Sequence, residues 1–354
     1  MKQKVSFLHG PHDLKVIEQD VPSPGPGQVL IKVKTCGICG SDVECFEGHS
    51  AEGRYDIAPY TPGHEWAGQI VEVGANCLSG LKVDDKVIGD CVMGCGKCYN
   101  CKEGRMPSAC LNFREIGFRP DSPGGMGEYM VVEEEYVHKF PDSWSWELGA
   151  WHEPFSIGYY GVWGNNGSID ASDTALVLGG GPIGMTAAIV AMTSGAKVIM
   201  VDPLESRRAR ALKYGVDVAL DPSSNFIEQV MDNTSGRGAD VIVECSGNDN
   251  AIASIFDIAS HSARVHLVGH SIGRKVPVEI GKTIWKTLSI TGSGGTKNFA
   301  QRTIRFMDRI KDTVDITGLT THRFDFAKIH DAFDVAVHQK AEALKVMLKI
   351  DKDL

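Results

Sequence analysis

The chain has 354 residues, enough for two or three domains at roughly 150 residues per domain. Hydrophobic residues make up 42% of the sequence and charged residues 23%, which is ordinary for a globular protein with a full-sized core. The formal net charge of −9 disfavours a dedicated binder of nucleic acid or of an anionic membrane.

The N-terminal part, residues 1–154, is expected to be rich in β-strands. Apolar and polar residues alternate over 29–34, 66–73 and 127–132, and turn signals such as PSPGPG at 22–27 separate these segments. The apolar stretch at the start of the chain is too short for a signal peptide, so we expect a cytoplasmic protein.

From about residue 155 to 290 the pattern changes to strands alternating with helices. We expect strands at 175–179, 197–202, 240–245 and 264–269, and helices at 183–194 and 204–214. This alternation predicts an α/β domain whose parallel sheet is covered on both faces. Residues 291–354 are mixed again, with a closing strand at 346–350.

One stretch within this region, residues 174–196, carries no formal charge and is long enough to span a bilayer. Its middle reads GGGP, which would break a membrane helix. A buried strand, a glycine turn and a buried helix explain the stretch better.

The turn GGGPIG at 179–184 fits the pattern G-x-G-x-x-G directly after a predicted strand and at the start of a predicted helix. In that context the glycines allow a tight turn and a close approach of a pyrophosphate to the helix N-terminus. An ordinary glycine turn is the alternative. The cofactor-binding residues predicted in this turn are Gly179, Gly181, Pro182, Ile183 and Gly184.

Asp202 ends the next predicted strand, 18 residues after the last glycine (202 − 184 = 18). A carboxylate there is expected to bind the ribose hydroxyls of NAD and to repel the 2′-phosphate of NADP. The neighbouring Arg207 and Arg208 weaken this preference for NAD.

Eight of the ten cysteines cluster within residues 36–45 and 91–110, which in a long chain indicates metal binding before disulfides. Four of them follow the spacing C-x2-C-x2-C-x8-C, and such a set can surround one zinc ion and close its shell. We therefore predict a structural zinc site. Disulfides and a nucleic-acid-binding zinc ribbon are the alternatives. The predicted ligands are Cys95, Cys98, Cys101 and Cys110.

A second set of metal-binding residue types is dispersed: Cys39 in GICGSD, His64 in GHEW and Glu153 in HEPFSIG. One thiolate, one imidazole and a carboxylate suit a zinc site that keeps a position open for substrate. Cys36 and Cys39 also form C-x-x-C, so thioredoxin-like redox chemistry is an alternative.

Taken in chain order, these motifs resemble the zinc-dependent medium-chain dehydrogenase/reductase superfamily over essentially the whole chain. The resemblance also rests on PGPGQVLIKV, PGHEWAGQIVEVG, GGMGEYMVV, VECSG and THRFDF. It implies a GroES-like catalytic domain, formed by 1–154 with its zinc lobe at about 91–112 and by the return at 291–354. It also implies a doubly wound Rossmann domain for NAD at 155–290.

Within this superfamily, HEPFSIG resembles the Glu-Pro signature of sorbitol, other polyol and threonine dehydrogenases. The resemblance implies that Cys39 and His64 bind the catalytic zinc. Glu65 and Glu153 would take turns in its shell, or one of them would hold the water on the metal.

The resemblance also implies roles around that zinc and at the cofactor. Ser41 would pass the substrate proton outward, and Asp42 would orient His64. Arg207 and Val268 join the predicted NAD site. The residues Phe46, His49, Phe118, Trp151 and His152 belong to the substrate pocket or to the core.

Two departures from the family pattern matter. Glu44 stands where threonine and sorbitol dehydrogenases usually have a histidine, so the proton relay is expected to use Glu44. This change disfavours threonine, and SDVECFEG is closer to enzymes of short sugar alcohols such as erythritol and threitol. The last spacer of the cysteine lobe is one residue longer than usual, and we expect a bulge near Met106 and Pro107 that keeps the zinc.

The predicted function is zinc- and NAD-dependent oxidation of a secondary alcohol of a polyol to the ketone. The alternatives are L-threonine 3-dehydrogenase, a cyclitol dehydrogenase, the zinc-free quinone-reductase-like branch and a non-enzymatic binding protein on the same scaffold. We expect a homotetramer or a dimer, a small-molecule substrate and no nucleic-acid or membrane partner. Free thiols are predicted at Cys36, Cys45, Cys77, Cys91 and Cys245.

Overall fold

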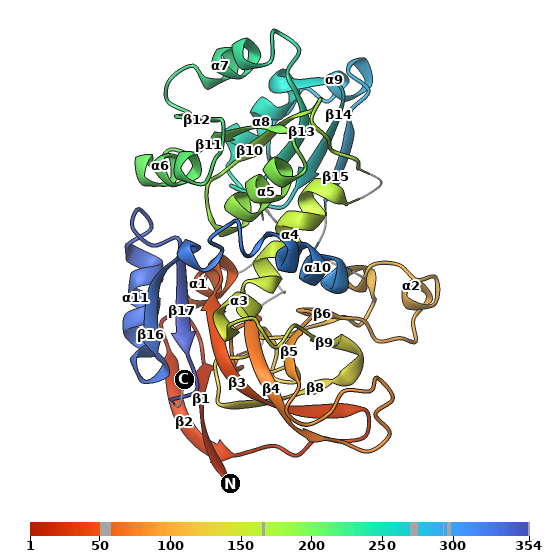
Figure 1. The fold of residues 1–354 in the computed structure, drawn as a ribbon, viewed down its shortest axis with the longest axis vertical. Helices are drawn as coiled ribbons and strands as arrows, with labels where there is room; N and C mark the ends of the chain where they lie inside the picture. The colour runs from red at the N-terminus through yellow and green to blue at the C-terminus, as the bar shows by residue number, and fades with distance from the viewer. Residues whose placement is uncertain (50–57, 165–166, 270–274, 293, 296–298, 353–354) are drawn as a thin grey trace. The chain divides into compact units, whose positions relative to one another are not determined.

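The computed structural model of the chain describes residues 1–49, 58–164, 167–269, 275–292, 294–295 and 299–352. The chain forms two compact units, one made of Met1–Glu153 with Gly295–Leu354 and the other of Pro154–Gly294 (Figure 1). The first boundary falls near the start of helix α4 (His152–Trp163). The domain roles expected from the sequence stay predictions.

The discontinuous unit is built on a mixed sheet in which strand β3 is central. Among the described residues the strand order is β16-β17-β3-β4-β5-β9, and β8 also pairs with β3. These strands are β3 (Gln28–Ile38), β4 (Glu65–Val73), β5 (Lys86–Gly89), β8 (Tyr129–Glu133), β9 (Val137–Lys139), β16 (Thr320–Asp325) and β17 (Lys345–Lys349).

Shorter elements complete this unit around the sheet. Two strand pairs are β1 (Lys2–Leu8) with β2 (Leu14–Asp20) and β6 (Val92–Met93) with β7 (Arg114–Glu115). The helices are α1 (Gly40–Phe46), α2 (Tyr99–Lys102), α3 (Trp146–Ala150), α10 (Ala300–Ile310) and α11 (Ile329–His338), with 3-10 turns η1 (Pro107–Ala109), η2 (Glu134–Tyr136), η3 (Thr317–Leu319) and η4 (Phe326–Lys328).

The register of the central strands sets the surroundings of the candidate metal site. Strand β3 is antiparallel to both neighbours, with Ile38 opposite Val346 of β17 and Gly37 opposite Glu65 of β4. Burial of the β-branched and aromatic side chains of β3 and β4 explains why these segments fold as strands. The strands expected at 29–34, 66–73, 127–132 and 346–350 are confirmed.

The unit Pro154–Gly294 is a parallel sheet with the order β12-β11-β10-β13-β14-β15. Numbered along the chain, this is the order 3-2-1-4-5-6 of a doubly wound dinucleotide fold, so the predicted class is confirmed. Its strands are β10 (Thr174–Leu178), β11 (Lys197–Val201), β12 (Val218–Leu220), β13 (Ala239–Glu244), β14 (Ala259–Leu267) and β15 (Ser289–Gly292). Its helices after α4 are α5 (Pro182–Thr193), α6 (Glu205–Lys213), α7 (Phe226–Asn233), α8 (Asp249–Ile258) and α9 (Gly281–Trp285).

The uncharged stretch 174–196 folds as the predicted strand, turn and helix. Strand β10 is buried along its whole length, and helix α5 is buried from Gly184 to Ala191. A segment buried on all sides has no position for a charged residue, which explains its composition. In the parts of the chain that the structure describes, every helix is too short or too polar to cross a membrane.

Candidate metal and cofactor sites

The four cysteines of the lobe converge on one point. The sulfur atoms of Cys95, Cys98, Cys101 and Cys110 all lie within 4.8 Å of one another. The Cys98 sulfur is 3.5 Å from that of Cys101 and 3.8 Å from that of Cys110. Zinc–sulfur bonds of 2.3 Å in a tetrahedron separate the sulfurs by roughly 3.8 Å, so this set fits one zinc ion.

Backbone N–H groups support the lobe thiols as metal ligands. Cys110 Sγ accepts from the N–H groups of Cys95 and Asn112 at 3.2 and 3.3 Å. The backbone N–H groups of Leu111 and Cys101 lower the pKa of Cys98 to about 6, which makes its thiolate available at neutral pH.

The longer spacer of the lobe is accommodated by a short turn. The position expected for the extra residue, near Met106 and Pro107, falls at the start of the 3-10 turn η1. Cys110 lies within the cysteine cluster after this turn, and retention of the zinc stays a prediction. All ten cysteines are free, including the five for which free thiols are predicted.

We expect the Cys98→Ser variant to lose one zinc per chain and to unfold at a lower temperature. The loss of a direct ligand should weaken zinc binding by more than the roughly 10–100-fold typical of an outer-shell change. Metal analysis of dialysed protein and thermal unfolding measure the two effects. Cys77→Ser, at a half-buried thiol outside the lobe, is the matched control. Unchanged zinc content in Cys98→Ser would contradict a structural zinc site.

Two of the three dispersed residues, Cys39 and His64, come together in the structure, and Glu65 joins them where the sequence motif offered Glu153. Cys39 follows β3 as the N-cap of α1, whereas His64 and Glu65 stand at the start of β4. Their ligand atoms lie within 4.8 Å of one another. Sulfur, imidazole nitrogen and carboxylate oxygen form the donor set of a zinc site, so this group fits the predicted catalytic zinc.

Asp42 holds the backbone next to both zinc-ligand candidates. Its buried carboxylate accepts the N–H of Cys39 at 2.9 Å and that of Gly63 at 3.3 Å. Oδ1 of Asp42 lies 3.9 Å from Nδ1 of His64, and this buried nitrogen has no hydrogen-bond partner among the described residues. If the two side chains moved slightly closer, Asp42 would accept a hydrogen bond from Nδ1 of His64, and Nε2 would be left to bind a metal.

Glu65 has a partner that the sequence did not indicate. Nζ of Lys345, on β17, donates to both carboxylate oxygens of Glu65 at 2.6 Å and to the carbonyl of Ile38 at 3.2 Å. Glu65 and Lys345 are 0% and 2% exposed. Burial alone lowers the pKa of the Lys345 ammonium, but the charge of Glu65 raises it above its usual value.

The absence of a side chain at Gly37 makes room for this ion pair. A Cβ atom at Gly37 would lie 2.2 Å from Oε2 of Glu65, closer than any real contact. The carboxylate therefore occupies the space above the backbone of β3, between β4 and β17.

Glu153 lies outside the group formed by Cys39, His64 and Glu65, but the charges of His64 and Glu65 affect its pKa. Burial is the main reason that its pKa rises to about 7, and Glu65 raises it further while His64 lowers it. The thiol of Cys91 donates to its Oε1 at 3.6 Å. A cation bound beside these two carboxylates would favour the ionised form of Glu153 and lower its pKa again.

The predicted proton-relay residues lie on α1, directly after Cys39. Ser41 is half-buried and Glu44 is exposed, and positions three apart lie on one side of a helix. The ring of Phe118 packs 5.0 Å from that of His64, which places this residue beside the site. Trp151 and His152 are buried at 0% and 2% exposure.

Two residues of the candidate site, Lys345 and Cys91, carry roles that the sequence did not reveal. A lysine at the start of the apolar run KVMLKI is the one sequence signal for the first, because lysine is almost never buried without a partner. Cys91 stands four residues before Cys95, the first predicted lobe ligand, and has no motif of its own. The predicted ligand and relay roles of the other residues stay predictions.

The glycine turn in the other unit has the geometry of a dinucleotide site. Gly181 caps α5 and Pro182 begins it, so N–H groups of the first turn lie next to the glycines. A Cβ atom at Gly184 would lie 1.8 Å from the carbonyl oxygen of Gly179, which allows glycine alone. Ile183 lies in the first turn of this helix.

Asp202 follows β11 and faces this turn. Its buried carboxylate accepts the N–H of Gly180 at 2.7 Å and that of Leu204 at 2.8 Å, and the guanidinium of Arg207 is 3.5 Å away. Arg208 is directed to Asp221. Val268 follows β14 and donates its N–H to the carbonyl of Glu244 at 2.8 Å. These residues lie at the carboxyl ends of the parallel strands, where such sheets bind ligands.

Comparisons with known proteins find relatives that match almost the whole chain. Residues 25–142 match the family model of the alcohol dehydrogenase GroES-like domain, and residues 182–312 match that of the zinc-binding dehydrogenases. L-threonine 3-dehydrogenase of Pyrococcus furiosus is 34% identical over 341 residues, 95% of each chain. Sorbitol dehydrogenase of Halalkalibacterium halodurans is 32% identical over 356 residues, 98% of this chain and 99% of the other.

Solved structures of alcohol dehydrogenases are also similar to this chain. An alcohol dehydrogenase of Escherichia coli CFT073 in complex with NADH superposes with a TM-score of 0.87 at 30% identity, covering 99% of each chain. The GroES-like fold expected for the discontinuous unit is therefore confirmed.

Proposed function

Because this chain belongs to the zinc-dependent medium-chain alcohol dehydrogenase family, we propose that it oxidises a secondary alcohol of a polyol to the ketone with NAD. The observation that carries the proposal is the convergence of Cys39, His64 and Glu65 within 4.8 Å of one another, next to Glu153. Zinc bound there would act as a Lewis acid and lower the pKa of the substrate hydroxyl.

The residues of α1 would handle the proton. The hydroxyl of Ser41 would hydrogen-bond the substrate hydroxyl and accept its proton, and Glu44 on the exposed face of α1 would deliver that proton to solvent. Asp42 would hold Cys39 and His64 in place through the backbone contacts described above. Bound NAD would supply the hydride acceptor for the carbinol carbon, so that one alcohol and one NAD would yield one ketone, one NADH and one proton.

The cofactor would bind in the unit Pro154–Gly294. The N-terminus of α5 would hold the pyrophosphate, and the carboxylate of Asp202 keeps lone pairs for the ribose hydroxyls of NAD. A 2′-phosphate would approach that same carboxylate, which favours NAD over NADP.

A screen of erythritol, threitol, sorbitol, myo-inositol and L-threonine with NAD tests the substrate. We expect NADH formation with one or more of the sugar alcohols and a kcat/KM at least about tenfold higher than that with threonine, which corresponds to 1.4 kcal/mol. The same assay with NADP should give a lower rate. Preference for threonine or inositol would replace the polyol assignment, and equal turnover with NADP would contradict the role of Asp202.

We further propose that the protein is a homo-oligomer that covers an exposed apolar face of α9. Ile280, Ile284 and Trp285 are 66%, 85% and 77% exposed. Strand β15, which follows this helix, stands at one end of the parallel sheet as the structure describes it. An apolar face beside a sheet edge is characteristic of an interface between protein chains.

Replacing Ile284 with Asp should shift the protein to a smaller species in sedimentation velocity, because a charge in an apolar interface is costly. Leu212→Asp is the matched control, since Leu212 is an exposed apolar residue on α6 at 51% exposure. Equal sedimentation of Ile284→Asp and the unmodified protein would show that this face is not the interface.

A further inference from the structure

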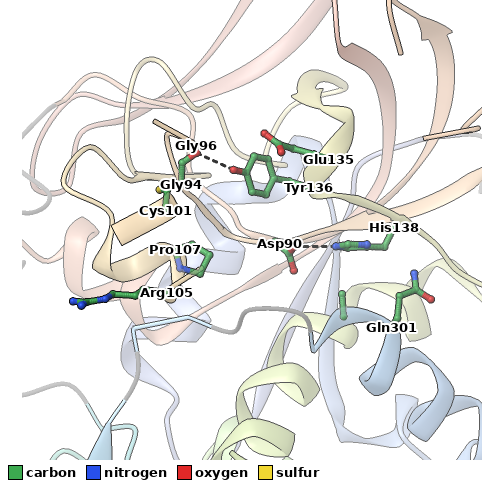
Figure 2. A pocket seen from close by; sticks show the side chains of 11 residues that line it. Asp90, Gly94, Gly96, Cys101, Arg105, Pro107, Glu135, Tyr136, His138 and Gln301 are labelled. Carbon is green, nitrogen blue, oxygen red and sulfur yellow. Dashed lines mark hydrogen bonds and ion pairs between the residues drawn. The ribbon is translucent and has the colours of Figure 1, made fainter. Parts of the chain in front are cut away.

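A cavity of about 500 Å³ opens beside the cysteine lobe, within the unit formed by Met1–Glu153 and Gly295–Leu354 (Figure 2). Its lining comes from the lobe, from the residue before Cys91, from the segment around η2 and β9, and from the start of α10. The volume is in the range of small-molecule sites. Among the described residues assigned above to zinc or to the proton relay, Cys101 alone lines it.

The centre of the lining is a fixed carboxylate. Nε2 of His138 lies 2.9 Å from Oδ2 of Asp90, and the N–H of Asp90 donates to the carbonyl of Tyr136 at 2.9 Å. Figure 2 shows this pair between the lobe on one side and Gln301 of α10 on the other. One oxygen of Asp90 contacts the imidazole, so the other can accept a hydrogen bond from a ligand.

The remaining walls combine ring surfaces with planar polar groups. The hydroxyl of Tyr136 donates to the carbonyl of Gly94 at 2.8 Å, which fixes the phenol ring against the lobe. Pro107 and Ala300 add apolar surface, while Glu135 and Gln301 add a carboxylate and an amide.

The lining has a small formal charge, and this limits the kind of ligand. It contains two carboxylates, Asp90 and Glu135, and one guanidinium, that of Arg105, so the formal charge is −2 + 1 = −1. These charged groups favour neither a strongly anionic nor a strongly cationic ligand. Carboxylates accept hydrogen bonds from the hydroxyl groups of a ligand, and an amide can both accept and donate them. The ring surfaces of the lining can pack against the C–H groups of such a ligand.

We propose that this cavity binds a neutral polyhydroxylated molecule, a sugar or a sugar alcohol, outside the predicted catalytic zinc site. Two contacts connect the cavity with that site. Asp90 directly precedes Cys91, whose thiol contacts Glu153, and Nε2 of His152 lies 3.3 Å from the carbonyl oxygen of Ala300. The ligand is therefore either the distal part of a long substrate or a separate molecule, and only the first case rests on the proposed function.

Isothermal titration of the full chain without NAD tests the site directly, with sorbitol, maltitol and sucrose as probes. Gln301→Trp introduces a bulky ring at an exposed position of the lining, and Asp90→Asn removes the charge of the carboxylate paired with His138. Both variants should weaken binding of at least one probe by about tenfold or more. Arg309→Trp, at an exposed position on the same helix α10, is the matched control and should bind normally.

Superimposable isotherms for the unmodified protein and both variants would overturn the proposal, as would the absence of binding for all three probes. Steady-state kinetics then identify the source of the ligand. A higher KM of Gln301→Trp for maltitol but not for erythritol assigns the cavity to the distal part of a substrate. An unchanged KM for both, with weaker binding, assigns it to a separate molecule.

The proposed function is tested separately from the cavity. If the protein shows no turnover but Gln301→Trp still loses binding, the dehydrogenase assignment fails and the cavity assignment stands.

Discussion

Replacing Lys345 with Met should lower the free energy of unfolding by about 3–5 kcal/mol. The change leaves the carboxylate of Glu65 buried and without the ammonium that now binds both of its oxygens at 2.6 Å. Methionine fills much of the space of the lysine side chain, so the lost stability comes from the unpaired charge of Glu65 and not from a cavity. Urea unfolding of zinc-loaded protein measures the change in the free energy of unfolding.

The double variant Lys345→Met with Glu65→Gln is the decisive comparison. It removes both charges, so it should recover more than half of the stability lost in the single variant. Lys349→Met, on the same strand but only half-buried, should cost less than about 1 kcal/mol. A loss below that value for Lys345→Met would contradict a buried ion pair at this position.

The His64→Ala variant should lose one zinc per chain and about 10³-fold or more in kcat, because the Lewis acid supplies several kcal/mol of stabilisation in the transition state. The lobe zinc should remain, since its cysteines are a separate group. Metal analysis and NADH formation measure the two effects on one sample.

The exposed His330 on α11 gives the control, and His330→Ala should keep both the zinc content and the activity. Treatment of the unmodified protein with a chelator provides an independent approach. A fully zinc-free sample that oxidises its alcohol at the normal rate, or a His64→Ala variant within about tenfold of normal activity, would refute catalysis by zinc at this site.

The sequence was most informative where burial and backbone geometry restrict the residue type. The strand expected at 175–179 is a continuous apolar run, and the strand expected at 240–245 has an apolar centre at 241–243, as parallel strands covered on both faces require. The glycine turn could be predicted because Gly184 tolerates no side chain. The cysteine lobe could be predicted because its ligands lie within a short segment.

Other features left little signal in the sequence. Strand β2 is exposed at most of its positions and therefore shows no clear alternation. The partnership of Lys345 and Glu65 depends on the order β17-β3-β4, which brings together residues 280 positions apart. The pairing of Asp90 with His138 likewise joins a loop to β9 across 48 residues. No local pattern encodes such long-range contacts.

The discontinuous unit also has a consequence for synthesis on the ribosome. Lys345 is translated 280 residues after Glu65, which takes about 15–55 s at 5–20 residues per second. The continuous segment Pro154–Gly294 is complete before that time, whereas β3 still lacks its neighbour β17. The segment Pro154–Gly294 can therefore fold before the discontinuous unit is complete, and Glu65 must stay hydrated until β17 is synthesised.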